Sequence, residues 1–271
     1  MIVVDNGSKE DEASIIEQAY PYVVVVRSKT NLGFAGGNNL GYQASHGKYI
    51  FFVNNDTEFT SDWNFVPLIN RLESSNSIGM VCPKIRFFWG SRPIQFAGFT
   101  PLSRITLRNH SIGFNEEDHG QYDSPHPTPY AHGAAMLVKR EAIESVGVMP
   151  ECFFLYYEEL DWSMMFDRAG YNIWYDPSCT IYHKESQTTG QGSPLRSYYI
   201  TRNRLLFAKR NLPMPRRWLT YGYLIFAVGI KDIAKHLMTN NPKLAKATIS
   251  GITDFLRGRS GYRPFCKQNP R

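Results

Sequence analysis

The sequence predicts an α/β fold: an open, mixed and mostly parallel sheet with helices on both faces, followed by a C-terminal helical appendage. Three apolar strands, expected at 2–4, 22–26 and 49–53, alternate with helical segments. Each of these strands ends in polar or glycine-rich sequence, and ligands bind at the carboxyl ends of strands in such sheets. The alternation therefore predicts both the fold class and the edge of the sheet that carries the site.

The composition narrows the class of protein. The chain has 271 residues, of which 42% are hydrophobic and 14% aromatic, and this excludes an intrinsically disordered protein. The formal net charge of +6 suits an anionic partner. Four cysteines lie far apart without a C-x-x-C pair, so we expect a reducing, cytoplasmic compartment. Neither a signal peptide nor a membrane-spanning run is recognisable, and we expect a soluble or peripheral protein.

The first half of the chain gives the clearest elements. A helix is expected at about 9–19, because Ser8 and Asp11 resemble an N-terminal cap pair. The run at 22–26 has no polar position, which is typical of a strand covered on both faces. Glycine-rich residues 31–37 predict a loop that can bring backbone N–H groups to an anion at the start of the next helix.

The later elements follow from the same periodicities. We expect, in order, a helix at about 38–45, a helix at 62–76, a strand at 78–85, loops and edge strands at 86–130, a strand within 130–140, helices at 140–146 and 158–169, and strands at 171–175 and 180–183. From about residue 195, basic residues are interspersed with aromatic ones, and 218–230 is nearly apolar. These changes predict a domain at 1–210 and a helical segment at 211–271.

Two residues could ligate a metal ion. Asp56 lies on a tight turn after the strand at 49–53, where a carboxylate can hold a hard divalent cation. A simple Asx turn is the alternative explanation. His183 ends a short strand and is a possible second ligand, although a lone histidine is more often a packed or surface residue. His132, beside Gly133, has a weaker claim.

Three acids at the start of one helix could supply a general base. Glu158, Glu159 and Asp161 lie within four residues, and crowded carboxylates raise one another's pKa. The alternative is that acids in a first helical turn merely favour the helix dipole. The aromatic run at 153–157 predicts a dry setting and favours the base. The usual dinucleotide, NTPase, lipase and zincin motifs do not occur.

Five segments in order carry a resemblance. They are 2–8 (IVVDNGS), 31–39 (NLGFAGGNN), 52–57 (FVNNDT), 133–140 (GAAMLVKR) and 153–161 (FFLYYEELD). Together they resemble family-two inverting glycosyltransferases of the GT-A fold, specifically the rhamnosyltransferase-like branch. The resemblance covers about residues 1–210. Each motif alone is loose, but their order makes the match specific.

The resemblance implies a role for each matched residue. Asp56 takes the place of the acid that binds Mg²⁺ or Mn²⁺, and His183 matches a downstream metal ligand. Glu159 takes the place of the catalytic base, but the family carries Asp there, so Asp161 stays open as the alternative. The residues assigned to the nucleotide are Asp5, which would bind the uracil or thymine ring, Asn6, Gly33, Gly37, Asn38 and Asn55.

The resemblance also implies a reaction and its partners. A sugar such as rhamnose would pass from a dTDP- or UDP-sugar to a hydroxyl of a glycan or polyprenyl-linked acceptor in cell-surface polysaccharide synthesis. One base suffices, because no covalent intermediate forms. The family normally starts with a strand and a helix that would precede Ile2, so we expect the chain as given to bind its donor poorly.

Three alternative functions remain open, and an anionic membrane surface is a further candidate partner. A nucleotidyltransferase would carry a basic residue just after the first strand, where 5–8 has none. A degenerate sugar-nucleotide-binding module is the second alternative. Nucleic-acid binding is weaker still, because no basic run stands out. The apolar stretch at 218–230, flanked by Arg and Lys, can lie on an anionic membrane surface or pack on the first domain.

Overall fold

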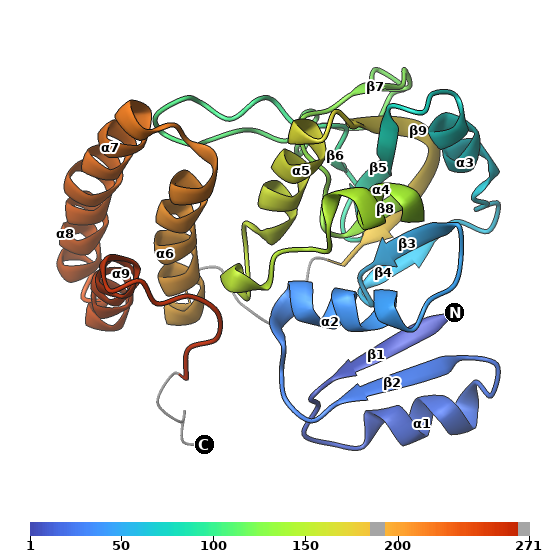
Figure 1. Cartoon of the computed structure of the whole chain (residues 1–271), viewed down its shortest axis with the longest axis horizontal. Helices are drawn as coiled ribbons and strands as arrows, with labels where there is room; N and C mark the ends of the chain where they lie inside the picture. Colours follow the sequence, from blue (N-terminus) through green and yellow to red (C-terminus); the bar gives the residue numbers. More distant parts are fainter. Residues whose placement is uncertain (185–192, 265–271) are drawn as a thin grey trace.

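The computed structural model describes residues 1–184 and 193–264 (Figure 1). The described strands form a small two-stranded sheet and a larger seven-stranded sheet. The small sheet lies at the lower right of Figure 1, and the C-terminal helices form the left side of the molecule. The mixed sheet, the helices on both faces and the helical C-terminal part are as expected, but the strands expected at 2–4 and 22–26 form a sheet of their own and do not join the strand at 49–53.

The N-terminal unit consists of β1 (Ile2–Asn6), α1 (Glu12–Ala19) and β2 (Val24–Ser28). β1 and β2 pair in parallel as predicted, and α1 connects them. Asp11 caps α1, since its carboxylate accepts a hydrogen bond from the Ser14 N–H. The expectation that the second strand is covered on both faces is wrong: Val24 is 54% exposed. β2 is the outer strand of a two-stranded sheet, so one of its faces meets solvent.

The larger sheet contains β3 (Tyr49–Val53), β4 (Thr57–Phe59), β5 (Ile78–Phe87), β6 (Ile94–Phe96), β7 (His126–Pro127), β8 (Ala135–Lys139) and β9 (Asn172–His183). Its main order is β3-β8-β5-β9-β4, with β6 on β5 and β7 on β9. Only the β5–β9 pair is parallel, so the expected excess of parallel pairs is wrong for this sheet. β3, β5 and β9 do run in one direction, but β8 is inserted antiparallel between β3 and β5.

Helices cover both faces of this sheet. They are α2 (Gly33–Gln43), α3 (Val66–Glu73), α4 (Arg140–Val146) and α5 (Glu158–Arg168). Neighbouring residues of β5 point to opposite faces, as the two-residue period of a strand requires. Met80 packs in the cluster that contains Phe166 of α5, whereas Val81 packs in the cluster that contains Leu68 of α3. The sheet is therefore buried on both sides.

Two segments differ from the expected elements. The predicted loop at 31–37 is largely the beginning of α2, which starts at Gly33. Small residues permit this because the helix packs closely on β1: a Cβ on Gly37 would lie 3.0 Å from Asn6 Nδ2. The two strands expected at 171–175 and 180–183 are one strand, β9, with a register shift against β5.

The C-terminal part is helical as predicted. It contains α6 (Pro194–Asn211), α7 (Met214–Gly222), a π-helical segment (Tyr223–Gly229), α8 (Ile230–Met238) and α9 (Pro242–Leu256). The boundary expected at residue 210 falls at the end of α6 and stays a prediction, and 265–271 lie outside the described residues. Within the described ranges, no helix combines the length and apolarity that crossing a bilayer requires.

Candidate active site

Asp56 and His183 are brought together by strand pairing. β4 runs antiparallel to the end of β9, with Thr57 opposite His183. Asp56 directly precedes Thr57, and its Oδ1 atom lies 3.1 Å from Nε2 of His183. Both side chains are largely withdrawn from solvent, with 19% and 9% of their surface exposed. The two residues predicted to ligate a metal are therefore neighbours at one edge of the sheet.

Gln95 of β6 orients the imidazole of His183. The Gln95 side chain is buried, and its Oε1 atom lies 2.9 Å from Nδ1 of His183. A carbonyl oxygen can only accept, so Nδ1–H donates and Nε2 is the atom that faces Asp56. A carboxylate oxygen and an imidazole nitrogen directed at each other suit a shared cation.

The donor set fits a divalent ion that also binds a ligand. Within 1–184 and 193–264, no three His, Cys, Asp or Glu side chains cluster as a metal site on their own. Asp56 and His183 would supply two ligands, and the remaining oxygens would come from a diphosphate or from water, as is common for Mg²⁺. The chemistry of the two side chains therefore fits the metal that the sequence predicted.

The turn that carries Asp56 lies beside the segment that leads into β8. The Asn54 N–H donates to the Ala134 carbonyl oxygen at 3.0 Å and so extends the β3–β8 ladder by one step. This places the turn next to His132 and Gly133. The rings of His132 and His183 are 6.2 Å apart, centroid to centroid.

Glu159 approaches the same segment from α5. A Cβ atom built on Gly133 would lie 3.9 Å from Cγ of Glu159 and 3.4 Å from the ring of Phe34. Ser163, fully buried in α5, holds the helix in place: its hydroxyl donates to the Glu159 carbonyl at 2.7 Å and accepts from the Ala131 N–H at 3.1 Å. The base candidate and the Asp56–His183 pair thus flank residues 132–133.

His132 is a neutral imidazole in this setting. Its Nδ1 atom accepts the Ala134 N–H at 3.1 Å, so its proton is on Nε2. The ring stacks on Phe99 with an interplanar angle of 9°. Burial, with a smaller effect of His183, lowers the pKa of His132 to about 3. His132 can therefore donate a hydrogen bond to a substrate without adding a positive charge.

The three acids of α5 have different surroundings. Burial raises the pKa of Glu159, and it raises the pKa of Glu158 well above its usual range, with a further contribution from the charge of Glu159. The Oε2 atom of Glu158 is buried and has no hydrogen-bond partner among the described residues. The pKa of both carboxyls is raised, and that of the more deeply buried Glu158 is raised further, so Glu159 is the better candidate for the base.

Asp161, the alternative candidate for the base, has structural partners on α6, and its catalytic role stays a prediction. Its side chain is fully buried. One oxygen accepts from Arg210 Nε at 2.9 Å and the other from Asn211 Nδ2 at 2.6 Å, both on α6. With both oxygens occupied, Asp161 joins α5 to α6. Two residues apart in a helix, Asp161 and Glu159 point in nearly opposite directions.

The turn before Glu158 is strained and is held by α6. Phe154, Tyr156 and Tyr157 have φ values of 68°, 68° and 80°, which residues with side chains rarely adopt. The Nδ2 atom of buried Asn203 lies 2.9, 2.7 and 2.9 Å from the carbonyl oxygens of residues 153, 155 and 156. Neighbouring Arg202 also donates to the first of these, at 2.7 Å. α6 therefore sets the backbone from which Glu158 and Glu159 project.

The predicted nucleotide residues lie on the N-terminal side. Asp5, at the end of β1, accepts the Ser8 N–H at 2.9 Å, and this hydrogen bond lowers the pKa of its carboxyl. Asn6 accepts from the Leu32 N–H at 2.9 Å and donates to the Gly33 carbonyl at 2.9 Å. The carboxyl end of β1 therefore meets the start of α2, as expected.

The glycine-rich segment packs rather than presents free N–H groups. The N–H of Gly33 donates to Asn31 Oδ1 at 2.8 Å, and the N–H of Phe34 donates to the Phe154 carbonyl at 2.9 Å. Gly33 has φ of +77°, and a Cβ there would lie 2.2 Å from the Phe154 oxygen, so only glycine fits. The anion-binding role expected for this loop is therefore wrong for these N–H groups. They are already used.

The other predicted nucleotide residues are less constrained. Asn38 donates to the Phe34 carbonyl within α2 at 2.9 Å, and Asn55 is exposed on the turn before Asp56. The adjacent Asn39 is the structural residue: it is buried and exchanges hydrogen bonds with the backbone of Met149 at 2.9 and 3.1 Å. The nucleotide contacts of Asp5, Asn6, Gly33, Gly37, Asn38 and Asn55 stay predictions.

Comparison with known proteins decides the family. Residues 1–147, more than half of the chain, match the family described as Glycosyl transferase family 2. The chain belongs to glycosyl transferase family 2. This membership confirms the resemblance that the sequence motifs predicted.

The similarity of this glycosyltransferase to its relatives extends beyond residues 1–147. It is 26% identical over 268 residues to the low-salt glycan biosynthesis hexosyltransferase Agl10 of Haloferax volcanii, covering 96% of this chain and 83% of that protein. It is 24% identical over 211 residues to the N-acetylglucosaminyl-diphospho-decaprenol L-rhamnosyltransferase of Mycobacterium tuberculosis, covering 70% and 68%.

Solved structures share the fold of this glycosyltransferase. The crystal structure of GalNAc-T7 with UDP, GalNAc and Mn²⁺ aligns with a TM-score of 0.55 at 14% identity, covering 89% of this chain. The chain spans about half (52%) of the GalNAc-T7 chain. The mannosyltransferase PcManGT of Pyrobaculum calidifontis, with GDP-Man and Mn²⁺, aligns with a TM-score of 0.52 at 13% identity, covering 94% of this chain and 77% of that one. The GT-A fold is thereby confirmed.

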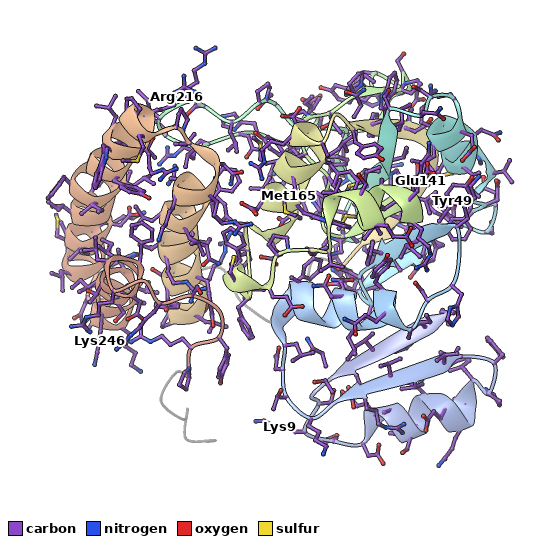
Figure 2. The ribbon with its side chains drawn as sticks, viewed as in Figure 1. Lys9, Tyr49, Glu141, Met165, Arg216 and Lys246 are labelled. Carbon is purple, nitrogen blue, oxygen red and sulfur yellow. The ribbon has the colours of Figure 1, made fainter. Side chains whose placement is uncertain are left out.

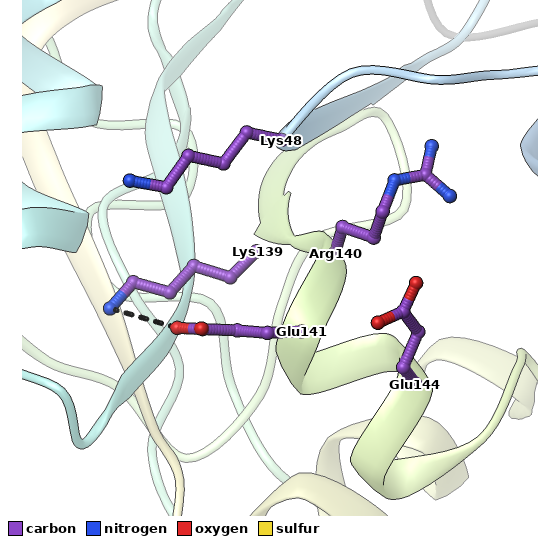
Figure 3. Close-up of a pocket in the computed structure, with 5 residues that line it drawn as sticks. All are labelled: Lys48, Lys139, Arg140, Glu141 and Glu144. Carbon is purple, nitrogen blue, oxygen red and sulfur yellow. Dashed lines mark ion pairs between the residues drawn. The ribbon is translucent and has the colours of Figure 1, made fainter.

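A charged cavity of about 180 Å³ lies away from the site (Figure 3). Its lining residues are Lys48, Lys139, Arg140, Glu141 and Glu144. In the β3–β8 pair, Tyr49 lies opposite Lys139 at one end and Val53 lies opposite Ala135 at the other. The cavity lies at the end of this pair that contains Lys139, whereas Asp56 follows the end that contains Val53. The cavity is therefore outside the candidate active site.

Proposed function

We propose that the chain is a metal-dependent inverting glycosyltransferase that moves a hexose, rhamnose or a similar sugar, to an acceptor hydroxyl. The proposal rests on one arrangement: Glu159, whose pKa burial raises, stands beside Gly133, and the Asp56–His183 pair stands beside the adjacent His132. A base and a cation-binding pair that flank the same two residues match inverting glycosyl transfer, which needs one general base and one divalent ion.

The proposed step uses Glu159 as the general base. Its carboxylate takes the proton of the acceptor hydroxyl, and the oxygen forms a bond to the anomeric carbon. The bond from that carbon to the diphosphate oxygen breaks on the opposite face, and the electron pair leaves with the nucleoside diphosphate. A divalent ion bound by Asp56 and His183 would offset the charge of that leaving group. Neutral His132 can hold a substrate oxygen through its Nε2–H.

The donor and acceptor are proposed from chemistry and from relatives. The family resemblance assigns Asp5, at the end of β1, to a uracil or thymine ring, so we propose a dTDP- or UDP-sugar. Of the relatives, one is named a hexosyltransferase and another a rhamnosyltransferase that acts on a decaprenyl-diphosphate-linked sugar. We therefore propose a glycan or polyprenyl-linked acceptor, used in cell-surface polysaccharide synthesis.

A donor panel tests this function. The protein is incubated with Mn²⁺ or Mg²⁺, a lipid-linked acceptor and dTDP-rhamnose, UDP-hexoses or GDP-mannose, and release of nucleoside diphosphate is measured. We expect release with one donor, its loss in Asp56→Ala, and its retention in Asp62→Ala, which removes an exposed acid nearby. Nucleotide binding without release by the wild type under every condition would identify a sugar-nucleotide-binding module instead. Release of pyrophosphate would identify a nucleotidyltransferase.

A further inference from the structure

The outer face of α7 and α8 exposes large apolar side chains. α7 and α8 form the left edge of the molecule in Figure 1. Seven of their apolar side chains, counting the π-helical segment between them, are each more than half exposed: Met214, Trp218, Leu219, Phe226, Ile230, Leu237 and Met238. Soluble monomers usually scatter such residues singly. A series along one continuous helical rod therefore indicates a surface that something covers.

The same region is strongly basic. Residues 211–264 contain nine basic residues and two acidic ones. One of the two acids, Asp254, is buried and paired with Arg259 and Arg263. Lys231 and Lys235 are exposed on α8, on the side that also carries Met238, and they lie about 100° or more around the helix from Ile230 and Leu237. Figure 2 labels further basic residues of this part, Arg216 on α7 and Lys246 on α9.

Exposed apolar side chains with lysines along their flank fit an anionic bilayer. Such helices lie in the interface, with the apolar residues below the headgroups and the lysines beside the phosphates. The helical run from Met214 to Met238 is about 37 Å long at 1.5 Å per residue, so it can present its face along the membrane plane. It lies on the bilayer and does not cross it, which agrees with the lack of a spanning helix in the described ranges.

We propose that the outer face of α7–α8 docks the protein on the surface of a membrane rich in anionic phospholipid. The occupant is the lipid headgroup region, chosen because the charge of the face complements it. The proposal does not depend on the glycosyl transfer reaction, since vesicle binding is measured without donor or acceptor. Docking through this face would bring the candidate base close to a lipid-linked acceptor. α8 packs on α9, α9 packs on α6, and α6 holds the turn before Glu159.

Flotation with vesicles tests the proposal. Vesicles of phosphatidylcholine alone are compared with vesicles that also contain phosphatidylglycerol. We expect the wild type to float with the anionic vesicles, to remain unbound with neutral ones, and to dissociate as the salt concentration rises. The triple variant Trp218→Ser/Phe226→Ser/Leu237→Ser should lose binding. The matched triple Ile15→Ser/Tyr22→Ser/Phe59→Ser, which alters exposed apolar residues elsewhere, should keep it.

A charge variant guards against misfolding of the apolar one. Lys231→Glu/Lys235→Glu should weaken binding by at least about tenfold, because each lysine near an anionic surface contributes about fivefold. Lys9→Glu/Lys29→Glu, on the N-terminal unit, should bind like the wild type. Circular dichroism melting confirms that each variant is folded.

Two outcomes would overturn the proposal. One is a wild type that does not float with anionic vesicles. The other is a dimer in light scattering that the apolar triple variant converts to a monomer while vesicle binding is unaffected, which would show that this face joins two copies of the chain.

Discussion

The glycosyltransferase holds its candidate site residues in two regions that are built differently. The first region, called the Gly133 rim, consists of Asp56, His183 and Glu159 around residues 132–133. Strand pairing joins Asp56 to His183, and Ser163 joins the backbone of Glu159 to Ala131. On the N-terminal side, exposed or half-buried hydrogen bonds hold Asp5 to Ser8, and Asn6 to Leu32 and Gly33 at the start of α2.

The difference shows in the electrostatics. At the Gly133 rim, burial moves the pKa of Glu159 upward and that of His132 downward, so both are biased toward their neutral forms. On the N-terminal side, Asp5 is solvated, and hydrogen bonds from Ser8, with a smaller contribution from the charge of Arg27, lower its pKa. Desolvation thus prepares the rim for proton transfer, whereas the N-terminal side is prepared for hydrogen bonding. The predictions below perturb one region at a time.

The largest effect is expected from Glu159→Gln. Loss of the general base should lower kcat by about 10²–10⁴-fold, while the affinity for the nucleoside diphosphate changes little. Single-turnover kinetics and nucleotide titration measure the two. Glu158→Gln is the matched control: burial favours the neutral form of Glu158, so the amide should leave kcat within a fewfold of the wild type. A greater loss of kcat in Glu158→Gln than in Glu159→Gln would reverse the assignment.

The contact between α5 and α6 should matter for stability. Arg210→Ala leaves the fully buried Asp161 carboxylate without its cation, which should lower the free energy of unfolding by about 3 kcal/mol. Lys209→Ala, which alters the exposed neighbour, should stay within about 0.5 kcal/mol in urea titrations. Folded Asp161→Asn should keep its kcat. A stable but inactive Asp161→Asn would restore a catalytic role to this residue.

The orientation of His183 should affect metal affinity. Gln95→Leu removes the oxygen that accepts from Nδ1, and we expect Mn²⁺ to bind about 10- to 100-fold more weakly. Electron paramagnetic resonance of free Mn²⁺ measures this without turnover. Gln18→Leu, on exposed α1, serves as the control. Unchanged affinity in Gln95→Leu would show that His183 needs no such support.

A smaller effect is expected on the N-terminal side. Asn6→Ala removes two hydrogen bonds, to Leu32 and Gly33, and each contributes about 1 kcal/mol. Since these hydrogen bonds are exposed or only half-buried and solvent can replace them in part, we expect a loss of about 1–2 kcal/mol in chemical denaturation. Hydrogen exchange should show faster opening of β1 and the start of α2, with the larger sheet unaffected.

The smallest expected effect is a shift in the pH profile of kcat, which tests the raised pKa of Glu159. A base with a raised pKa becomes active only above that pKa, so the acidic limb of the kcat profile should lie above the ordinary value for Glu, about 4.3. The sign for stability is the reverse: a carboxyl whose pKa is raised by folding stabilises the protein at low pH and loses that contribution as the pH rises through the folded pKa. An acidic limb at or below the ordinary value would contradict the burial of Glu159.

Much of the fold could be read from local patterns. The positions of most strands and helices follow from hydrophobic periodicity, which depends only on near neighbours in sequence. The alternation of strands and helices then predicts the common direction that β3, β5 and β9 have. β8 between β3 and β5 could not be foreseen, because strand order depends on which apolar edges meet. Gln95 and Asn203 were missed for the same reason: an amide in a strand or a helix carries no sign of its distant partner.

The sequence by itself determined the family, the position of the acids on α5 and the turn that carries Asp56. These depend on residue type and on spacing along the chain. Only the tertiary structure decided that Asp161 is bound by α6, that Gly33 serves packing against Phe154, and that Glu159 stands beside Gly133. The reason is physical: a side chain's chemistry is inherent in its type, but its pKa and its partners are set by the groups that folding places around it.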